Sequence, residues 1–313
     1  MTKPIIAVIG ATGAQGGSLC DAILSDANSE FSCRAVTRDP NKDKARILLT
    51  RGSEIVQADL DDVDSLTTAF TGAHAVFAVT NFWEHFSGAK EMEQAKNIAD
   101  ACRAAGIKHV VWSSLEDTRD FMDADDTRMP MLQEKYRVPH FDAKAEADKY
   151  FVDLPVTILW PCFYWDNLYA FGLAPKRDND GKYSWAFPMG DNKMAGIAAE
   201  DIGKVAYGIF KAGSEYIGKT VGIASEFLSI KEMGDKISAA LDIGPIAYHD
   251  VSADAYRAFG FPGAEELGNM FQVYRDFEAE FKKTRSPELA RKLNPELMSF
   301  DQFLAKYKSL IPV

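Results

Sequence analysis

The stretch IIAVIGATGAQGG, residues 5–17, decides the fold of this chain. It joins an apolar run, Ile5 to Ile9, to a cluster of glycines: Gly10, Gly13, Gly16 and Gly17. An apolar strand that turns through glycines into a helix leaves backbone N–H groups at the positive end of that helix, where a pyrophosphate can bind. The stretch therefore predicts the first strand, turn and helix of a dinucleotide-binding fold.

The spacing of these glycines is looser than the GxGxxG fingerprint, because Gly10, Gly13 and Gly16 are each three residues apart. A glycine cluster can also be a strand-to-helix turn that only needs a positive φ. Its position directly after an N-terminal apolar strand favours nucleotide binding.

Arg38 indicates which nucleotide would bind. It follows a second apolar strand, predicted over 32–37, at the point where an NAD-specific site would carry an acidic residue for the ribose 2′-hydroxyl. A guanidinium there would meet a 2′-phosphate through a planar, charge-assisted contact. We therefore expect NADP rather than NAD; the alternative is an exposed arginine at a strand end. Asn41, Lys42 and Lys44 keep the neighbourhood basic.

Composition limits the classes of function. The 313 residues are 47% hydrophobic and carry a formal net charge of −11, which disfavours direct nucleic-acid binding. No apolar run approaches the ~20 residues of a membrane span, and the first strand begins too early to leave room for a signal peptide. We expect no membrane association and a cytoplasmic location, with the nucleus also open.

The cysteines predict no metal site. Cys20, Cys33, Cys102 and Cys162 are scattered, without CxxC or other metal-ligand spacing. We expect reduced core cysteines, with reactivity an alternative only for Cys162, which follows Pro161 at the end of a predicted strand.

Apolar strands alternate with helices through the first half, which predicts an α/β Rossmann fold with a doubly wound parallel sheet. The strands are predicted near 5–9, 32–37, 54–57, 74–79, 108–113 and 155–160, and two of the helices near 62–71 and 88–105. After Pro161 a short strand at 183–187 is expected with helices at 200–212, 230–241, 252–259, 263–281 and 299–309. Ser229 and Glu232 predict a capping box for the 230–241 helix. We therefore divide the chain into a Rossmann domain, 1–160, and a smaller, mostly helical lobe, 161–313, which makes excursions back to the sheet.

Polar residues stand at the ends of the later strands, where the crevice of an open α/β sheet lies. Asp59 could accept from an adenine amino group beside the apolar Leu60, or it could cap the next helix. Thr80 and Asn81 would lie beside the nicotinamide ribose. Phe82 and Trp83 could form a wall there, although aromatic residues at a strand end are more often core.

The segment HFDAK places His140 and Lys144 four residues apart, and therefore on one face of a helix. Histidine titrates near neutral pH without help, so His140 could transfer a proton. Lys144 is well suited to holding a ribose. Ser113 and Ser114, at the end of the fifth strand, could bond a substrate carbonyl.

Residues 115–139 form a long acidic connection without an apolar period. A connection of this length is typical of a lid, a partner-binding loop or a disordered segment, and simple solvation is the alternative. If coenzyme ordered it, nucleotide state would control surface shape.

These residues resemble the NmrA-like family of atypical short-chain dehydrogenase/reductases, and in particular its NADP-binding redox-sensor branch. The similarity spans almost the whole chain and is carried by GATGAQGG, AVTRDP, VTNFWE, HFDAK, PCFYWDNL and FGFPGAEELGNMF. The resemblance implies a Rossmann domain that binds NAD(P), has no catalytic tyrosine and acts as a regulator. In short-chain dehydrogenases that tyrosine would stand at His140 and work with the lysine.

The resemblance also implies the residues that bind the coenzyme. They are Gly10, Thr12, Gly13, Ala14, Gln15, Gly16, Arg38, Asp59, Leu60, Thr80, Asn81, Phe82, Lys144 and the turn Cys162, Phe163 and Tyr164, with Lys42 as a second 2′-phosphate contact.

Two functions remain open at this point. The first is an NADP(H)-binding regulator whose coenzyme state controls its conformation, assembly as a homodimer, or binding of a protein partner. The second, suggested by similarity to isoflavone-reductase-like enzymes, is an NADPH-dependent reductase of a small carbonyl, quinone or enone compound. It would use Lys144, with His140 or Tyr164 as a proton donor. A scaffold that has lost its coenzyme is a third reading, but the intact glycines and Arg38 disfavour it.

Overall fold

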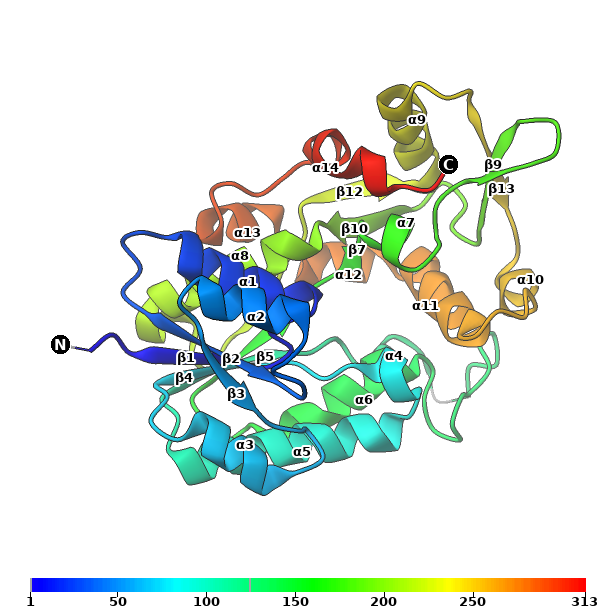
Figure 1. The fold of residues 1–313 in the computed structure, drawn as a ribbon. Helices are drawn as coiled ribbons and strands as arrows, with labels where there is room; N and C mark the ends of the chain where they lie inside the picture. The colour runs from blue at the N-terminus through cyan, green and yellow to red at the C-terminus, as the bar shows by residue number, and fades with distance from the viewer. Residues whose placement is uncertain (1, 124) are drawn as a thin grey trace.

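The structure is a computed structural model that describes residues 2–123 and 125–313. Its centre is a seven-stranded, all-parallel sheet in the order β11-β6-β5-β4-β1-β2-β3 (Figure 1). The strands are β1 (Ile5–Val8), β2 (Ser32–Thr37), β3 (Glu54–Gln57), β4 (Ala75–Ala78), β5 (His109–Ser113), β6 (Val156–Trp160) and β11 (Thr220–Gly222). This confirms the predicted Rossmann sheet, and each predicted strand lies within one residue of its expected bounds.

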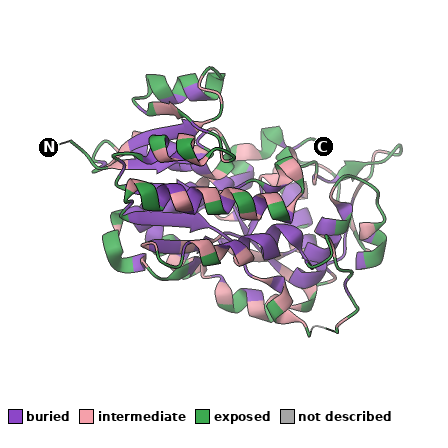
Figure 2. Ribbon diagram, turned by 90° about the horizontal axis from the view of Figure 1, so that it is seen from below, coloured by how far each residue is buried: buried purple, intermediate pink, exposed green. Residues whose placement is uncertain are grey.

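Helices cover both faces of this sheet (Figure 1), and its strands are mostly buried (Figure 2). On one face lie α1 (Ala14–Ser25), α2 (Asp43–Thr50) and α8 (Ala199–Lys211); on the other lie α3 (Val63–Phe70), α5 (Gly88–Ala105) and α6 (Pro139–Ala147). Side chains of successive residues of β1 lie on opposite faces of the sheet. Ile6 and Val8 pack beneath α1 and α8, whereas Ala7 packs beneath α3 and α5. The strands are therefore buried on both sides, as parallel sheets require.

Helix α8 lies late in the sequence but packs directly on α1. A Cβ at Gly203 would overlap the backbone and side chain of Ser18 and the backbone of Leu19, so glycine is what allows the two helices to approach so closely. Strand β11, also late, pairs with β6 at the sheet edge. The chain beyond residue 161 thus contributes to the layers around the large sheet.

The second lobe carries helices and two small three-stranded sheets. Its helices are α7 (Asn167–Ala170), α9 (Ile230–Leu241), α10 (Ala253–Arg257), α11 (Ala264–Asp276), α12 (Glu278–Thr284), α13 (Pro287–Leu293) and α14 (Phe300–Tyr307). One sheet has the order β12-β10-β7 and the other β13-β9-β8. Their strands are β7 (Phe163–Tyr164), β8 (Lys176–Arg177), β9 (Tyr183–Phe187), β10 (Lys193–Ile197), β12 (Glu226–Ser229) and β13 (Ile246–Asp250).

Apart from the one over 263–281, the expected helices of this lobe are present, and 230–241 has its predicted bounds and its predicted capping box. The single helix expected over 263–281 is wrong, because the backbone leaves helical geometry at Phe277, whose ring stacks on Phe121, and α12 follows. Except for β9, the small strands were not predicted. They run for only two to five residues, too short for a readable alternation.

Shorter elements complete the chain. They are α4 (Phe82–His85) and the 3₁₀ segments Thr118–Phe121, Asp148–Tyr150, Gly213–Tyr216 and Lys308–Leu310. Among the described residues, no helix is both long and apolar enough to cross a bilayer, and no cluster of side chains suits a metal ion. The cysteines are unpaired and buried, and burial raises the pKa of the Cys162 thiol to about 12.

Hydrogen bonds hold the connection over 115–139 at several points. Residue 124 lies outside the described residues. The buried carboxylate of Asp142 accepts from the Thr118 backbone at 2.8 Å and from the Arg137 backbone at 2.7 Å. A bridge between Leu132 and Tyr136 forms a small turn. Its described residues therefore form a packed connection and not a merely solvated one.

Candidate functional site

A cavity of about 730 Å³ opens beyond the carboxyl ends of the central strands, between the large sheet and the second lobe. Every candidate residue predicted from the sequence lines it: Gly10, Thr12, Gly13, Ala14, Gln15, Gly16, Arg38, Lys42, Asp59, Leu60, Thr80, Asn81, Phe82, His140, Lys144, Cys162, Phe163 and Tyr164. The structure therefore brings these residues to one place, and their individual roles stay predictions.

The glycine turn has the geometry of a phosphate cradle. Gly10 has a φ of +64°, and its carbonyl accepts from the Gly13 N–H at 2.8 Å. A Cβ at Gly16 would overlap the carbonyl oxygens of Ile9 and Gly10. Helix α1 begins after Gly13 with no side chain capping its first N–H groups, which leaves these donors for a ligand.

Gln15 supplies a further sign that the cavity fits a polar ligand. Its Nε2 donates to the Tyr164 hydroxyl at 2.5 Å, whereas its Oε1 is buried without a partner among the described residues. Buried acceptors in folded proteins are normally satisfied, so this oxygen calls for a donor from a bound molecule. Burial raises the pKa of Tyr164 well above its usual range.

Arg38 lies at the mouth of the cavity and is paired with Glu84 of α4. Its Nη2 donates to Glu84 Oε2 at 3.1 Å, Nη1 donates to Oε1, and these bonds raise the pKa of Arg38. Both side chains are largely exposed to solvent. Glu84 was not predicted as a site residue from the sequence. A phosphate that binds Arg38 would have to compete with the Glu84 carboxylate.

At the expected adenine end, Asp59 is not the cap of helix α3. The carboxylate of Asp62 accepts from the Asp64 and Ser65 backbones and caps that helix. Among the described residues, the carboxylate of Asp59 accepts only from the Asp61 backbone, at 3.0 Å. The capping alternative for Asp59 is therefore wrong, and its carboxylate lines the cavity beside Leu60.

Lys144 belongs to a buried ionic network that the sequence did not reveal. Its Nζ lies 2.6 Å from Glu91 Oε1 and donates to Thr80 Oγ1 at 2.6 Å. Burial by itself would raise the pKa of Glu91, but the Lys144 charge and hydrogen bonds from His85, Lys144 and Thr80 bring it down to about 2. An ammonium held this way is suited to positioning a ligand and poorly suited to acting as a base.

We expect this network to contribute stability that is fully present above about pH 4.5 and is lost as the pH falls toward about 2. Because the pKa of Glu91 is lower in the folded protein, the unfolded chain binds the proton first, and acid favours unfolding. The difference corresponds to about 3 kcal/mol. Denaturant titrations at about pH 3 and about pH 7 should show a smaller stability difference for Glu91→Gln than for wild type.

The control for that comparison is Glu93→Gln, on an exposed side chain two residues further along the same helix. It should keep the wild-type response to acid. An equal response of Glu91→Gln and wild type would contradict the assignment.

His140 is bound by Glu266, a buried residue of α11 that lies 126 positions away in the chain. Glu266 Oε1 accepts from the His140 backbone N–H at 2.8 Å and also contacts Nδ1 of the ring. The ring packs against Trp83 at 4.8 Å and Phe141 at 4.8 Å between centroids. These contacts fix the imidazole in the cavity wall.

The remainder of the cavity wall is apolar and comes mostly from the second lobe. It includes Phe141, Phe163, Leu173, Leu267, Met270 and Tyr274. Ser114 was expected to bond a substrate carbonyl here, but its hydroxyl donates to Asp148 at 2.6 Å and is buried. Asp148 also accepts from Trp112. Ser113 and Ser114 both line the cavity, and the carbonyl contact expected of them stays a prediction.

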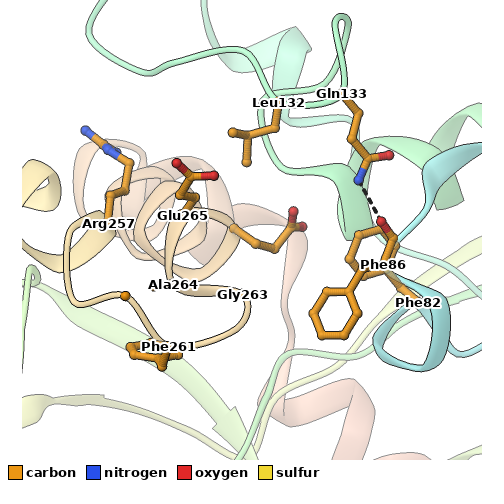
Figure 3. A pocket seen from close by; sticks show the side chains of 11 residues that line it. Phe82, Phe86, Leu132, Gln133, Arg257, Phe261, Gly263, Ala264 and Glu265 are labelled. Atoms are coloured by element: carbon orange, nitrogen blue, oxygen red, sulfur yellow. Dashed lines mark hydrogen bonds between the residues drawn. The ribbon is translucent and has the colours of Figure 1, made fainter.

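A second cavity, of about 420 Å³, lies behind α4 (Figure 3). It shares Phe82 and Phe86 with the first cavity and is otherwise lined by Leu132, Gln133, Arg257, Gly260, Phe261, Gly263, Ala264, Glu265 and Glu266. Gln133 holds the backbone after α4 at the rim of this cavity. The Gln133 side chain donates to the Phe86 carbonyl at 3.0 Å and accepts from the Gly88 N–H at 2.8 Å. The Arg257 guanidinium points away from the other side chains shown.

Comparison with known proteins gives consistent results. The model of the NmrA-like family matches residues 2–304. The NmrA-like family domain-containing oxidoreductase FrzB of Cladobotryum sp is 30% identical over 286 residues, which cover 85% of this chain and 82% of that protein.

Solved structures share the fold. The negative transcriptional regulator NmrA in complex with NADP has a TM-score of 0.79 at 24% identity, covering 98% of this chain and 95% of that one. The triphenylmethane reductase of Citrobacter sp., complexed with NADP(H), has a TM-score of 0.73 at 17% identity, covering 97% and 99%.

Proposed function

This chain belongs to the NmrA-like family, and from that premise we propose that it is an NADPH-dependent reductase of a small, apolar carbonyl, quinone or enone compound. The observation that carries the proposal is the two-part cavity, with a phosphate cradle and Arg38 at one end and apolar walls at the other. The oxidoreductase name of the curated relative and the NADP bound to two structural neighbours support it.

The chain's own residues would hold the coenzyme along the cavity. The free N–H groups of the glycine turn face the expected position of the diphosphate. Arg38 and Lys42 would take the 2′-phosphate, and Asp59 with Leu60 the adenine. Thr80, Asn81 and Lys144 would meet the nicotinamide ribose. NADPH bound in this way would supply a hydride to a second molecule.

The apolar part of the cavity would receive that second molecule. Phe163, Met270 and Tyr274 are buried residues of the second lobe that face the cavity. Pockets lined by apolar side chains with a few polar groups are typical sites for small molecules and exclude water from them. Water exclusion protects a hydride donor, and the lining selects an apolar acceptor.

The test is consumption of NADPH with a panel of aromatic aldehydes, enones and quinones. We expect turnover by the wild-type protein and its loss in Leu267→Trp, which fills the apolar part, while NADPH binding is retained. Leu241→Trp, on a half-buried leucine outside the cavity, serves as the control. A broad panel without turnover would reject the reductase.

Arg38→Ala should weaken binding of NADPH by roughly 10- to 100-fold and leave that of NADH nearly unchanged. A charge-assisted contact to a phosphate contributes about 1.5–3 kcal/mol, and only NADPH carries the 2′-phosphate. Titration calorimetry measures both affinities. Arg46→Ala, on an exposed arginine of α2, should leave both unchanged. Equal affinities of the wild type for NADPH and NADH would remove the NADP assignment.

A second candidate, a regulator governed by coenzyme state, is favoured by the contact between Arg38 and Glu84. A 2′-phosphate at Arg38 competes with Glu84, and α4, which carries Glu84, leads to Phe86 and its bond from Gln133. Coenzyme binding would thereby reach the 115–139 connection on the surface. A molar mass or hydrogen-exchange pattern over 82–88 and 129–136 that differs between the protein bound to NADP and the protein bound to NAD, which has no 2′-phosphate, supports this candidate; an identical one rejects it.

A further inference from the structure

We propose that His140 and Glu266 form the proton-donating pair of this site, with His140 as the donor and Glu266 as the residue that positions it. The inference rests on the proposed reductase function and names the group that replaces the missing tyrosine. It is carried by the hydrogen bonds of Glu266 to two nitrogens of His140 and by the position of the pair between the two cavities.

The hydrogen bonds determine which ring nitrogen faces a substrate. An ionised carboxylate only accepts, so Nδ1 carries the hydrogen that points at Glu266. Nε2 has no hydrogen-bond partner among the described residues, and His140 lines the coenzyme cavity. Nε2 is thus the nitrogen available to a molecule in that cavity. Trp83 and Phe141 hold the ring in this orientation.

The other two candidate proton donors are less suited to the transfer. The Lys144 ammonium is bound to Glu91 and Thr80. The Tyr164 hydroxyl accepts from Gln15 and keeps its own proton, but burial raises its pKa and makes it a weaker acid than an ordinary tyrosine. The imidazole of His140, by contrast, has Nε2 without a partner among the described residues and can reach a molecule in the cavity through it.

In the proposed step, the carbonyl acceptor takes up a hydride and a proton at different atoms. A carbonyl acceptor gains a hydride from NADPH at carbon, its C=O π bond breaks, and its oxygen takes the proton from His140 Nε2. The products are an alcohol, NADP⁺ and a neutral imidazole that still carries the Nδ1 hydrogen. Glu266 stabilises the imidazolium before the transfer, as a carboxylate does beside a catalytic histidine.

The pair lies across the wall between the two cavities. His140 lines the coenzyme cavity and Glu266 lines the second cavity. The carboxylate is therefore kept apart from the substrate and is bordered on its far side by the second cavity. Glu265, the adjacent residue, lines the same second cavity but does not contact His140, which makes it a matched control.

A purely structural role for Glu266 must be separated from this one, because its bond to the His140 backbone also caps the first turn of α6. Glu266→Gln keeps an acceptor for both N–H groups and removes only the charge. His140→Phe keeps an aromatic ring against Trp83 and Phe141 and removes the proton.

The experiment compares two acceptors with the same protein. A carbonyl acceptor needs a proton as well as a hydride, whereas a cationic triarylmethane dye becomes neutral on accepting a hydride and needs no proton. We expect His140→Phe to lower kcat for the carbonyl by about 10²–10⁴-fold relative to kcat for the dye. Glu266→Gln should lower the ratio of kcat for the carbonyl to kcat for the dye about 10-fold, whereas Glu265→Gln should leave this ratio unchanged. NADPH affinity should stay unchanged in all three variants.

A spectroscopic readout tests the pair without turnover. In ¹⁵N-labelled wild-type protein the Nδ1–H proton of His140 should resonate far downfield, move upfield in Glu266→Gln and stay in place in Glu265→Gln. A ratio of the two kcat values that His140→Phe leaves unchanged overturns the proton donor and leaves the reductase standing. Failure of both acceptors with wild type overturns the reductase and the proton transfer together. A wild-type Nδ1 without a hydrogen overturns the role of Glu266.

Discussion

Glu116→Ala is expected to lower the free energy of unfolding by about 3–5 kcal/mol, the cost of leaving a buried charge without its partner. Glu116 follows the fifth strand of the sheet, and its side chain is 4% exposed; that of Arg285, its partner, is 1% exposed. Arg285 donates to Glu116 Oε2 at 2.6 Å and to the Pro161 carbonyl at 2.9 Å. The ion pair thus joins three distant parts of the chain beneath the cavity.

Denaturant titration monitored by circular dichroism measures this loss, and an exposed ion pair supplies the control. Lys231 and Asp235 lie one helical turn apart on α9, and both side chains are mostly in solvent. Asp235→Ala should change the stability by less than about 1 kcal/mol. A Glu116→Ala protein as stable as the Asp235→Ala protein would show that the cavity floor does not depend on the buried pair.

The groups that the sequence predicted correctly are those whose position follows from a local rule. Gly10, Arg38 and Thr80 each lie one or two residues after the end of a strand of the parallel sheet. The carboxyl ends of such strands meet at one edge, so a linear reading suffices to gather them there. This is why the structure places all the predicted residues around one cavity, although it does not test what each of them binds.

The groups that the sequence missed are the acidic partners of its basic candidates. Arg38 meets Glu84, Lys144 meets Glu91, and His140 meets Glu266. Each glutamate comes from a helix whose distance from the partner in space is set by tertiary packing, which no local pattern encodes. A glutamate in a helix also looks like an ordinary solvated residue.

A signal for two of these partners was nevertheless present. Glu91 stands four residues before the buried Ala95, and Glu266 stands four residues before the buried Met270, so each shares a helix face with a core residue. A carboxylate on the buried face of an amphipathic helix needs a partner, because an unpaired buried charge is strongly unfavourable. A charged residue that interrupts an apolar helix face therefore predicts a buried partner of opposite charge.

The other large effect is expected at the glycine turn, where Gly16→Ala should weaken NADPH binding by roughly 10²–10⁴-fold. A Cβ at this position overlaps the backbone carbonyls of Ile9 and Gly10, which are held by the sheet and by the turn. Helix α1 must therefore shift away from β1, and its first N–H groups leave the phosphates. Loss of two hydrogen bonds to a charged group, at about 1.5–3 kcal/mol each, accounts for the range.

The loss of NADPH affinity in Gly16→Ala must be separated from any loss that replacing a glycine elsewhere in the chain would cause. Gly244→Ala introduces the same methyl group where no atom lies within 4 Å of it, and should leave NADPH affinity unchanged. Binding is measured by calorimetry, and the melting temperature without coenzyme shows whether the Gly16→Ala protein is folded. A folded Gly16→Ala protein with wild-type affinity would mean that the diphosphate does not bind at this turn. Because Arg38 and the expected ribose contacts are placed by the same strand ends, the NADP assignment would then fail with it.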